Sequence, residues 1–143
     1  DCAPSLGMMT INALAATDGI IVPTIPQHLP TKGIEKLLES VHQVRRGINP
    51  SLKIEGILMT LMDGRTVYER EISEMIRNAY GGKINIFETE IPRSVRAAET
   101  SAEGKSIFVY APKSKVAEAY RQLTKEVLAL EKQREEHRAE IGR

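Results

Sequence analysis

The sequence predicts an α/β fold with a mainly parallel β-sheet and helices on both of its faces. Short apolar segments alternate with amphipathic helical segments, and successive apolar segments begin roughly 30 residues apart, as in βαβ units. The apolar segments show little polar–apolar alternation, which is typical of strands covered on both sides. The chain has 143 residues and 41% hydrophobic content, enough for one domain with its own core.

The first three elements are predicted from apolar spacing and from proline and glycine. Ser5 is a suitable N-cap for a first helix. Residues 19–23 form an apolar run closed by proline and predict a buried strand, and residues 31–47 predict an amphipathic helix ended by glycine. The first helix should bury one apolar face, made by Met8, Met9, Ile11, Leu14 and Ala15.

Two more strands and two more helices are expected before the last long helix. Strands are predicted at residues 54–62 and 84–91, with a helix at residues 67–80 between them. Residues 94–102 have the pattern of a short helix, closed by Gly104. Residues 106–110 are apolar and compatible with either a strand or a turn.

The last long helix is predicted at residues 113–131 and should pack against its own sheet. Its apolar stripe stops at Leu130, which disfavours a coiled coil. Residues 132–143 are almost wholly polar, so we expect them to fray or project. The predicted organisation is one domain over residues 1–131 with a polar tail over residues 132–143.

Composition excludes several classes of protein. The formal net charge of +1 gives no general indication of a nucleic-acid binder, and the one cysteine excludes an internal disulfide framework. No apolar run approaches the roughly 20 residues that span a bilayer. The three histidines lack metal-ligand spacing. The chain begins with Asp rather than Met, so we expect it to be the carboxyl part of a longer protein.

The expected fold places several polar residues together. The carboxyl ends of parallel strands lie along one edge of a sheet, and ligands bind there. This edge would collect the loop at residues 23–27, the turn at residues 63–65, and Pro92 with Arg93. Asp1 precedes a turn that opens a helix, so it should lie at the same edge, where Mg²⁺ and phosphate chemistry is found.

Five segments resemble motifs of the ParA/Soj family of partitioning ATPases. Residues 1–7, D-C-A-P-S-L-G, resemble its Walker B segment D-x-P-P-S-L-G, and residues 10–16 share the T-x-N-A-L-A-A helix that follows. Residues 62–66, M-D-G-R-T, resemble its F-D-x-R-T turn, with Met62 in place of phenylalanine. Residues 91–96, I-P-R-S-V-R, resemble I-P-R-N-V-R, and residues 112–120 resemble P-K-S-x-G-A-E-A-Y. The matches run in order from residue 1 to about residue 130.

The resemblance implies a P-loop NTPase-like fold that lacks its N-terminal part, and a cytoplasmic, nucleoid-associated protein. Such a protein would bind ATP and Mg²⁺, dimerise with ATP, bind DNA without sequence preference and respond to a ParB-like partner. Asp1 would be the catalytic residue that holds Mg²⁺ through water. The other implied nucleotide-binding residues are Pro4, Met62, Asp63, Pro92 and Arg93. The implied DNA-binding residues are Arg65, Arg93, Arg96 and Lys105.

One family motif is absent from these residues. The phosphate-binding loop K-G-G-x-G-K-[ST] does not occur, and Gly104-Lys105-Ser106 lacks both the upstream glycines and a preceding strand. Since positioning and charge stabilisation provide most of phosphoryl-transfer catalysis, we expect this chain alone to have no ATPase activity.

Other interpretations of the same residues remain open. Asp63 to Thr66 can be simple turn chemistry, in which Thr66 caps the next helix. The region from Arg93 to Lys115 has five Lys or Arg against two Glu, which suits phosphates but also suits a solvated helix face. A MinD-like membrane-cycling ATPase would need an amphipathic tail, whereas residues 132–143 have one large apolar residue, Ile141. A non-catalytic DNA-binding or interaction module is the remaining alternative.

Overall fold

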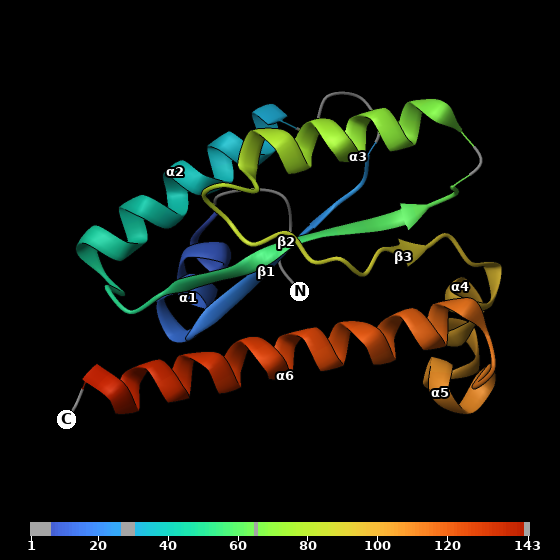
Figure 1. Cartoon of the computed structure of the whole chain (residues 1–143). Coiled ribbons are helices and arrows are strands. Elements are labelled where there is room, and N and C mark those ends of the chain that lie inside the picture. Colours follow the sequence, from blue (N-terminus) through green and yellow to red (C-terminus); the bar gives the residue numbers. More distant parts are fainter. Residues whose placement is uncertain (1–6, 27–30, 65, 142–143) are drawn as a thin grey trace.

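A three-stranded parallel sheet in the order β1-β2-β3 forms the centre of the molecule in the computed structural model (Figure 1). The strands are β1 (Gly19–Thr24), β2 (Lys53–Met62) and β3 (Ile91–Pro92). The register pairs Gly19 with Lys53 in β1 and β2, and Thr60 with Ile91 in β2 and β3. The structure describes residues 7–26, 31–64 and 66–141. The expected N-cap residue Ser5 lies outside them.

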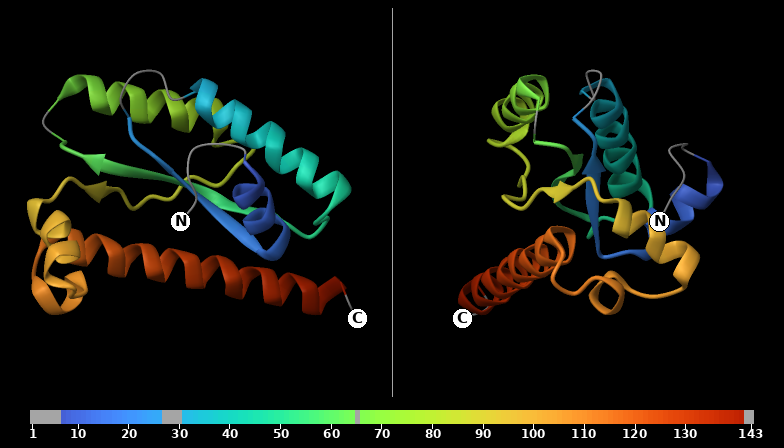
Figure 2. Two further views of the ribbon diagram at one scale, coloured as in Figure 1. Left: turned by 180° about the vertical axis from the view of Figure 1, so that it is seen from behind. Right: turned by 90° about the vertical axis from the view of Figure 1, so that its right-hand side faces the viewer.

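The described helices cover both faces of this sheet. Figure 2 shows α2 (Thr31–Gly47) and α3 (Val67–Tyr80) on one side of the sheet and α6 (Lys115–Ile141) on the other. The shorter helices are α1 (Met8–Ala16), α4 (Val95–Glu103) and α5 (Ile107–Tyr110). The predicted α/β class, with parallel strands between two helical layers, is confirmed.

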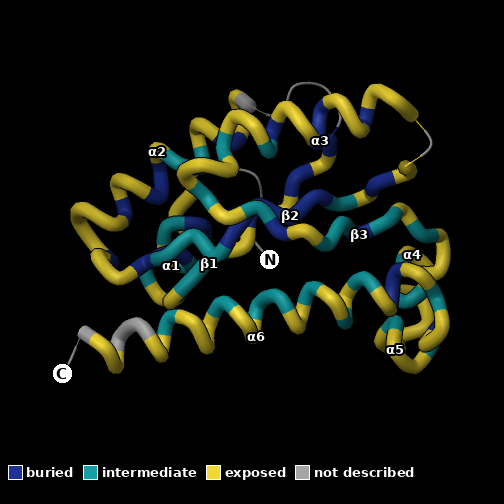
Figure 3. Tube along the Cα trace, viewed as in Figure 1, coloured by how far each residue is buried: buried dark blue, intermediate teal, exposed yellow. Residues whose placement is uncertain are grey.

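Strand β2 contributes side chains to a core on each face of the sheet, which explains the apolar run Ile57, Leu58 and Met59 at its centre. Ile57 and Met59 pack with α2 and α3 on one face, where Ile72 and Ile76 meet them. Leu58 packs on the other face in a second core, together with Phe87, Ile91 and Val116. Five of its ten residues are therefore buried, four are half-buried and one is exposed, as Figure 3 shows in colour.

Strand β2 ends in an irregularity at Leu61. The register with β3 shifts between Thr60 and Met62, and Leu61 has a φ of 57°, in the left-handed region. The shift brings Met62 to the same core as Met59, although the two residues are three positions apart. Met62 is consequently buried, whereas Leu61 is 38% exposed.

The strand predicted at residues 84–91 is wrong over most of its length. Only Ile91–Pro92 is strand, with one isolated bridge between Ile57 and Ile86. Between them, the Glu126 carboxylate of α6 accepts the backbone N–H groups of Glu88 and Thr89, both at 2.9 Å. These N–H groups are bound by a side chain, so they do not extend the strand ladder.

Two boundaries near the carboxyl end also differ from expectation. Residues 107–110 form the short helix α5 rather than a strand or a turn, because the Ser106 carbonyl accepts the N–H groups of residues 109 and 110. Helix α6 continues to Ile141 instead of fraying after residue 131. Within that extension, Arg134 forms an ion pair with Glu55 at the start of β2.

The expected apolar face of the first helix is only partly correct. Leu14 is buried against α2, but Met8 and Met9 are 71% and 82% exposed. In α6, the spacing predicts a stripe of Val116, Tyr120, Leu123, Val127 and Leu130. All of these residues pack in or against the core as predicted except Tyr120, which is 39% exposed. The helical spacing thus identified the elements correctly but assigned too many of their residues to the core.

Candidate functional site

The carboxyl ends of β2 and β3 lie side by side, as the parallel topology predicts. The Arg93 N–H donates a hydrogen bond of 2.9 Å to the Met62 carbonyl. This contact brings the turn that begins at Asp63 next to Pro92 and Arg93. In Figure 1 the starts of α4 and α6 lie at the same end of the molecule. Asp1, Pro4 and Arg65 lie outside the described residues.

The turn after β2 is held by the first residues of α3. The Thr66 hydroxyl caps the helix by accepting the Glu69 N–H at 3.3 Å. The Glu69 carboxylate accepts the N–H groups of Asp63 and Gly64, at 3.0 and 3.1 Å. The Arg70 guanidinium donates to the Gly64 carbonyl at 2.9 Å. The backbone of Asp63 and Gly64 is therefore held by α3 itself.

Helix α4 presents Arg96 in its first turn. Ser94 is the N-cap, and its hydroxyl accepts the Ala97 N–H at 3.3 Å. The helix ends at Gly104, whose φ of 60° is in the left-handed region that glycine adopts without strain. Lys105 follows and forms an ion pair of 3.6 Å with Glu103, so its charge is partly compensated.

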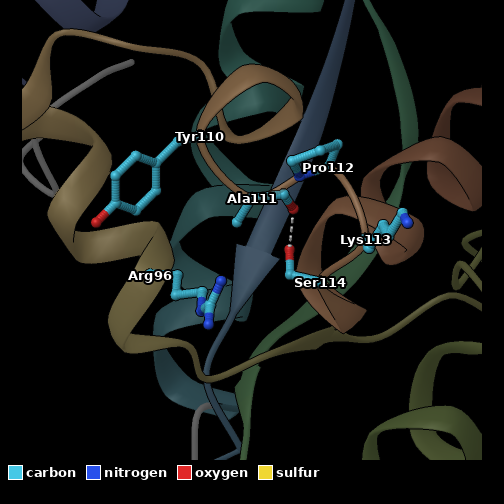
Figure 4. Close-up of a pocket in the computed structure, with 6 residues that line it drawn as sticks. All are labelled: Arg96, Tyr110, Ala111, Pro112, Lys113 and Ser114. Carbon is cyan, nitrogen blue, oxygen red and sulfur yellow. Dashed lines mark hydrogen bonds between the residues drawn. The ribbon is translucent and has the colours of Figure 1, made fainter.

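A pocket of ≈ 380 Å³ lies between α4, α5 and the start of α6 (Figure 4). In Figure 4 the Arg96 side chain extends from α4 toward the segment that leads into α6. The Ser114 hydroxyl donates to the Ala111 carbonyl at 2.7 Å and accepts the Ala117 N–H at 3.3 Å. The pocket is lined by Arg96, Tyr110, Ala111, Pro112, Lys113 and Ser114.

Two cations, Arg96 and Lys113, line this pocket, and Arg93 and Lys115 lie beside its lining residues in the sequence. Within the described part of the chain, the exposed side chains of Arg93, Arg96, Lys113 and Lys115 form no ion pair. The positive end of the α6 dipole adds to this field. Unpaired cations at a helix start suit an anionic group such as a phosphate. Lys113 was not among the predicted site residues, although the P-K-S resemblance includes it.

Tyr110 ties one wall of the pocket to α4. Its hydroxyl donates a hydrogen bond of 3.0 Å to the Glu99 carboxylate. This hydrogen bond is the main reason why the pKa of Tyr110 is raised above its ordinary value of 10.0, and burial adds to the rise. Arg96 acts in the opposite direction and lowers the pKa of this hydroxyl. Tyr110 thus remains a neutral hydrogen-bond donor at physiological pH.

The described residues contain no cluster of side chains that could ligate a metal ion without other ligands. No group of three or more His, Cys, Asp or Glu side chains in residues 7–26, 31–64 and 66–141 could hold a metal ion. Mg²⁺ is commonly held by one or two carboxylates, water and substrate phosphates, so such a cage is not required. Over the same residues, no helix combines the length and apolar character needed to cross a membrane.

Comparisons with known proteins identify relatives of this chain. A family model described as an AAA domain matches residues 1–54. The chain is 43% identical over 129 residues to the chromosome-partitioning ATPase Soj of Thermus thermophilus, covering 90% of this chain and 51% of that protein. It is 40% identical over 129 residues to the sporulation initiation inhibitor protein Soj of Bacillus subtilis, covering 90% and 50%. The corresponding values for the chromosome partitioning protein ParA of Myxococcus xanthus are 39% over 128 residues, covering 90% and 44%.

Solved structures show the same fold. Cobyrinic acid a,c-diamide synthase from Mycobacterium smegmatis with bound ADP and magnesium is 33% identical, with a TM-score of 0.67. The match covers 85% of this chain and 42% of that one. The same enzyme with a bound ATP analogue and magnesium is 34% identical, covers 85% and 43%, and has the same TM-score of 0.67. These neighbours confirm the expected P-loop NTPase-like α/β fold. The chain spans about half the length of the curated relatives it matches.

Proposed function

Because the chain belongs to the ParA/Soj family, we propose that the whole protein is a DNA-binding partitioning ATPase of the cytoplasm that associates with the nucleoid. The observation that carries the proposal is identity of 39–43% over 90% of the chain to three proteins, two of them named for chromosome partitioning. ATP binding drives dimerisation, and a ParB-like partner stimulates hydrolysis and releases DNA. The described chain contributes a ligand edge and a cationic surface to this cycle.

The ligand edge is proposed to border the nucleotide, with Asp63 and Pro92 beside its base, as the family resemblance implies. Met62, Asp63, Pro92 and Arg93 meet where β2 and β3 end, and ligands of parallel sheets bind at this edge. Asp1 and Pro4 would complete the site, with Asp1 as the carboxylate for Mg²⁺. When bound, the ion would neutralise charge on the nucleotide phosphates. In support, the neighbouring cobyrinic acid synthase was solved with ADP and magnesium.

The cationic surface is proposed to bind DNA phosphates. Arg93, Arg96 and Lys113 are exposed near the start of α6. Arg65 and Lys105 are included in this surface because the family resemblance implies that they bind DNA. Phosphate contacts carry no base information, so such a surface tolerates any DNA sequence. The ion pair between Lys105 and Glu103 makes Lys105 the weaker contributor. Lys113 joins the predicted residues because it lines the same pocket as Arg96.

A salt titration of duplex binding tests this surface in the full-length protein with ATP. The variant Arg65→Ala with Arg96→Ala should weaken binding and reduce the slope of log affinity against log salt by about 0.9 for each lost contact. Its matched control is Arg45→Ala with Arg46→Ala, because these exposed arginines lie in the last turn of α2, at the opposite end of the molecule.

One further readout, ATP-dependent dimerisation, completes this experiment. ATP-dependent dimerisation should be unchanged in both double variants, since neither removes a proposed nucleotide contact. Wild-type affinity and slope in Arg65→Ala with Arg96→Ala would show that the cations form a solvated helix face. An equal loss in the control would show that binding follows net charge alone and has no defined surface.

A further inference from the structure

Glu69 is a buried acidic residue at the start of α3. It is 6% exposed, and acidic side chains are seldom buried this far unless they are paired. Its carboxylate accepts two backbone N–H groups, those of Asp63 and Gly64, at 3.0 and 3.1 Å. Two charge-assisted hydrogen bonds therefore offset the burial of this carboxylate.

These contacts reach beyond an ordinary helix cap. In a capping box the acidic residue at the third helical position binds the N–H of the cap residue, which here is Thr66. Glu69 occupies that position but binds residues two and three places before the cap. Arg70 binds the carbonyl of Gly64, so both polar backbone groups of this glycine are held by α3. Gly64 has a φ of 68°, which suits glycine.

The residues held by Glu69 lie at the ligand edge. Asp63 directly follows Met62, whose carbonyl accepts the Arg93 N–H from the next strand at 2.9 Å. The side chains of Asp63 and Arg93 are exposed, whereas Glu69 lies beneath the turn. Loss of the Glu69 carboxylate would remove the acceptor of these two N–H groups. The backbone that a ligand at this edge would meet would then be held less firmly.

We propose that Glu69 is a positioning residue that fixes the turn at Asp63 and Gly64 for recognition of the nucleotide base. This inference rests on the proposed nucleotide site. A turn that is ordered before binding spares the ligand the entropic cost of ordering it, which raises affinity. It also holds polar backbone groups in one arrangement, which favours one base over another.

The test compares Glu69→Gln with Glu71→Gln in the full-length protein. Glu71 is exposed on the same helix, so both variants remove one negative charge. Glutamine keeps the shape of Glu69 but loses the charge and one acceptor site, so the Kd for ATP with Mg²⁺ should rise about tenfold. The preference for ATP over GTP should fall. Plain electrostatics predicts the reverse sign, since removal of a negative charge should tighten binding of an anion.

A third variant separates positioning from general destabilisation. Ser73→Ala removes a side chain that is 5% exposed and donates to Glu90 at 3.1 Å, one turn along α3. It should lower stability without changing nucleotide preference. An equal loss of preference in Ser73→Ala or Glu71→Gln would overturn the proposal. If the wild type binds ATP, wild-type affinity and preference in Glu69→Gln would also overturn the proposal. If the wild type binds no nucleotide, the proposed function is refuted instead.

Hydrogen exchange of the wild type covers the case in which Glu69→Gln does not fold. The amides of residues 63 and 64 should exchange slowly in the nucleotide-free protein, because Glu69 already binds them. Fast exchange of both amides until ATP is added would show that the ligand orders the turn and that Glu69 does not.

Discussion

The left-handed backbone of Leu61 allows a direct test of the end of β2. Leu61 is the only residue other than glycine with a positive φ in the part of the chain that the structure describes. A residue with a Cβ in this conformation costs about 1–2 kcal/mol, because the Cβ approaches the following carbonyl oxygen. Replacing Leu61 by glycine removes this cost, whereas replacing it by alanine does not.

The comparison of the two variants isolates the backbone contribution. Leu61 is 38% exposed, so both variants lose a similar part of the 1.5–3 kcal/mol that full burial of a leucine contributes, about 1–2 kcal/mol. At an ordinary strand position glycine is about 0.5–1 kcal/mol less stable than alanine. Relief of the left-handed conformation reverses this order. We therefore expect Leu61→Gly to be more stable than Leu61→Ala by about 0.5–1 kcal/mol.

Equilibrium urea unfolding of the full-length protein measures this difference. The control is Lys53, a partly buried residue at the start of β2 whose φ is not positive. There, Lys53→Ala should be more stable than Lys53→Gly, which is the usual order. If alanine is the better replacement at both positions, Leu61 does not carry the strain inferred from its φ of 57°.

Three other features give predictions with a clear sign. Gly56→Ala should destabilise the protein by about 1–3 kcal/mol in urea unfolding, because its Cβ would lie 2.8 Å from the Phe87 ring. Gly33→Ala should instead stabilise helix α2 by about 0.5–1 kcal/mol, since its Cβ would meet nothing within 4 Å. An ultraviolet titration should place the pKa of Tyr110 above 10.0, and Glu99→Gln should lower it. The contribution of their hydrogen bond to stability should be present below pH 10 and lost as pH rises through this raised pKa.

Much of the fold could be predicted because its signals are local. The helix predicted at residues 67–80 has those bounds in the structure, since Thr66 caps it and its apolar residues repeat at helical spacing. The strand predicted at residues 19–23 is Gly19–Thr24. Parallel pairing followed from the spacing of these elements, and it correctly predicted that the turn after β2 lies beside Pro92 and Arg93.

The errors arise where distant side chains decide the local structure. The third strand is short because Glu126 binds backbone groups that a neighbouring strand would otherwise bind, from 37 and 38 positions away. The polar end of α6 remains helical, and there Arg134 pairs with Glu55, 79 positions earlier. Apolar periodicity carries no information about such contacts. A segment whose local pattern predicts a strand or a polar tail can therefore adopt a different structure.

The same limit applies to the candidate site. Thr66 and Glu69 have the spacing of a capping box, and that pattern alone assigns Glu69 to the helix. The structure shows that its carboxylate accepts hydrogen bonds from the N–H groups of Asp63 and Gly64, before the helix begins. Helix α3 therefore has two roles, since one face closes the core while its first turn orders the end of β2. A substitution at Glu69 should consequently alter the ligand edge more than it alters the core.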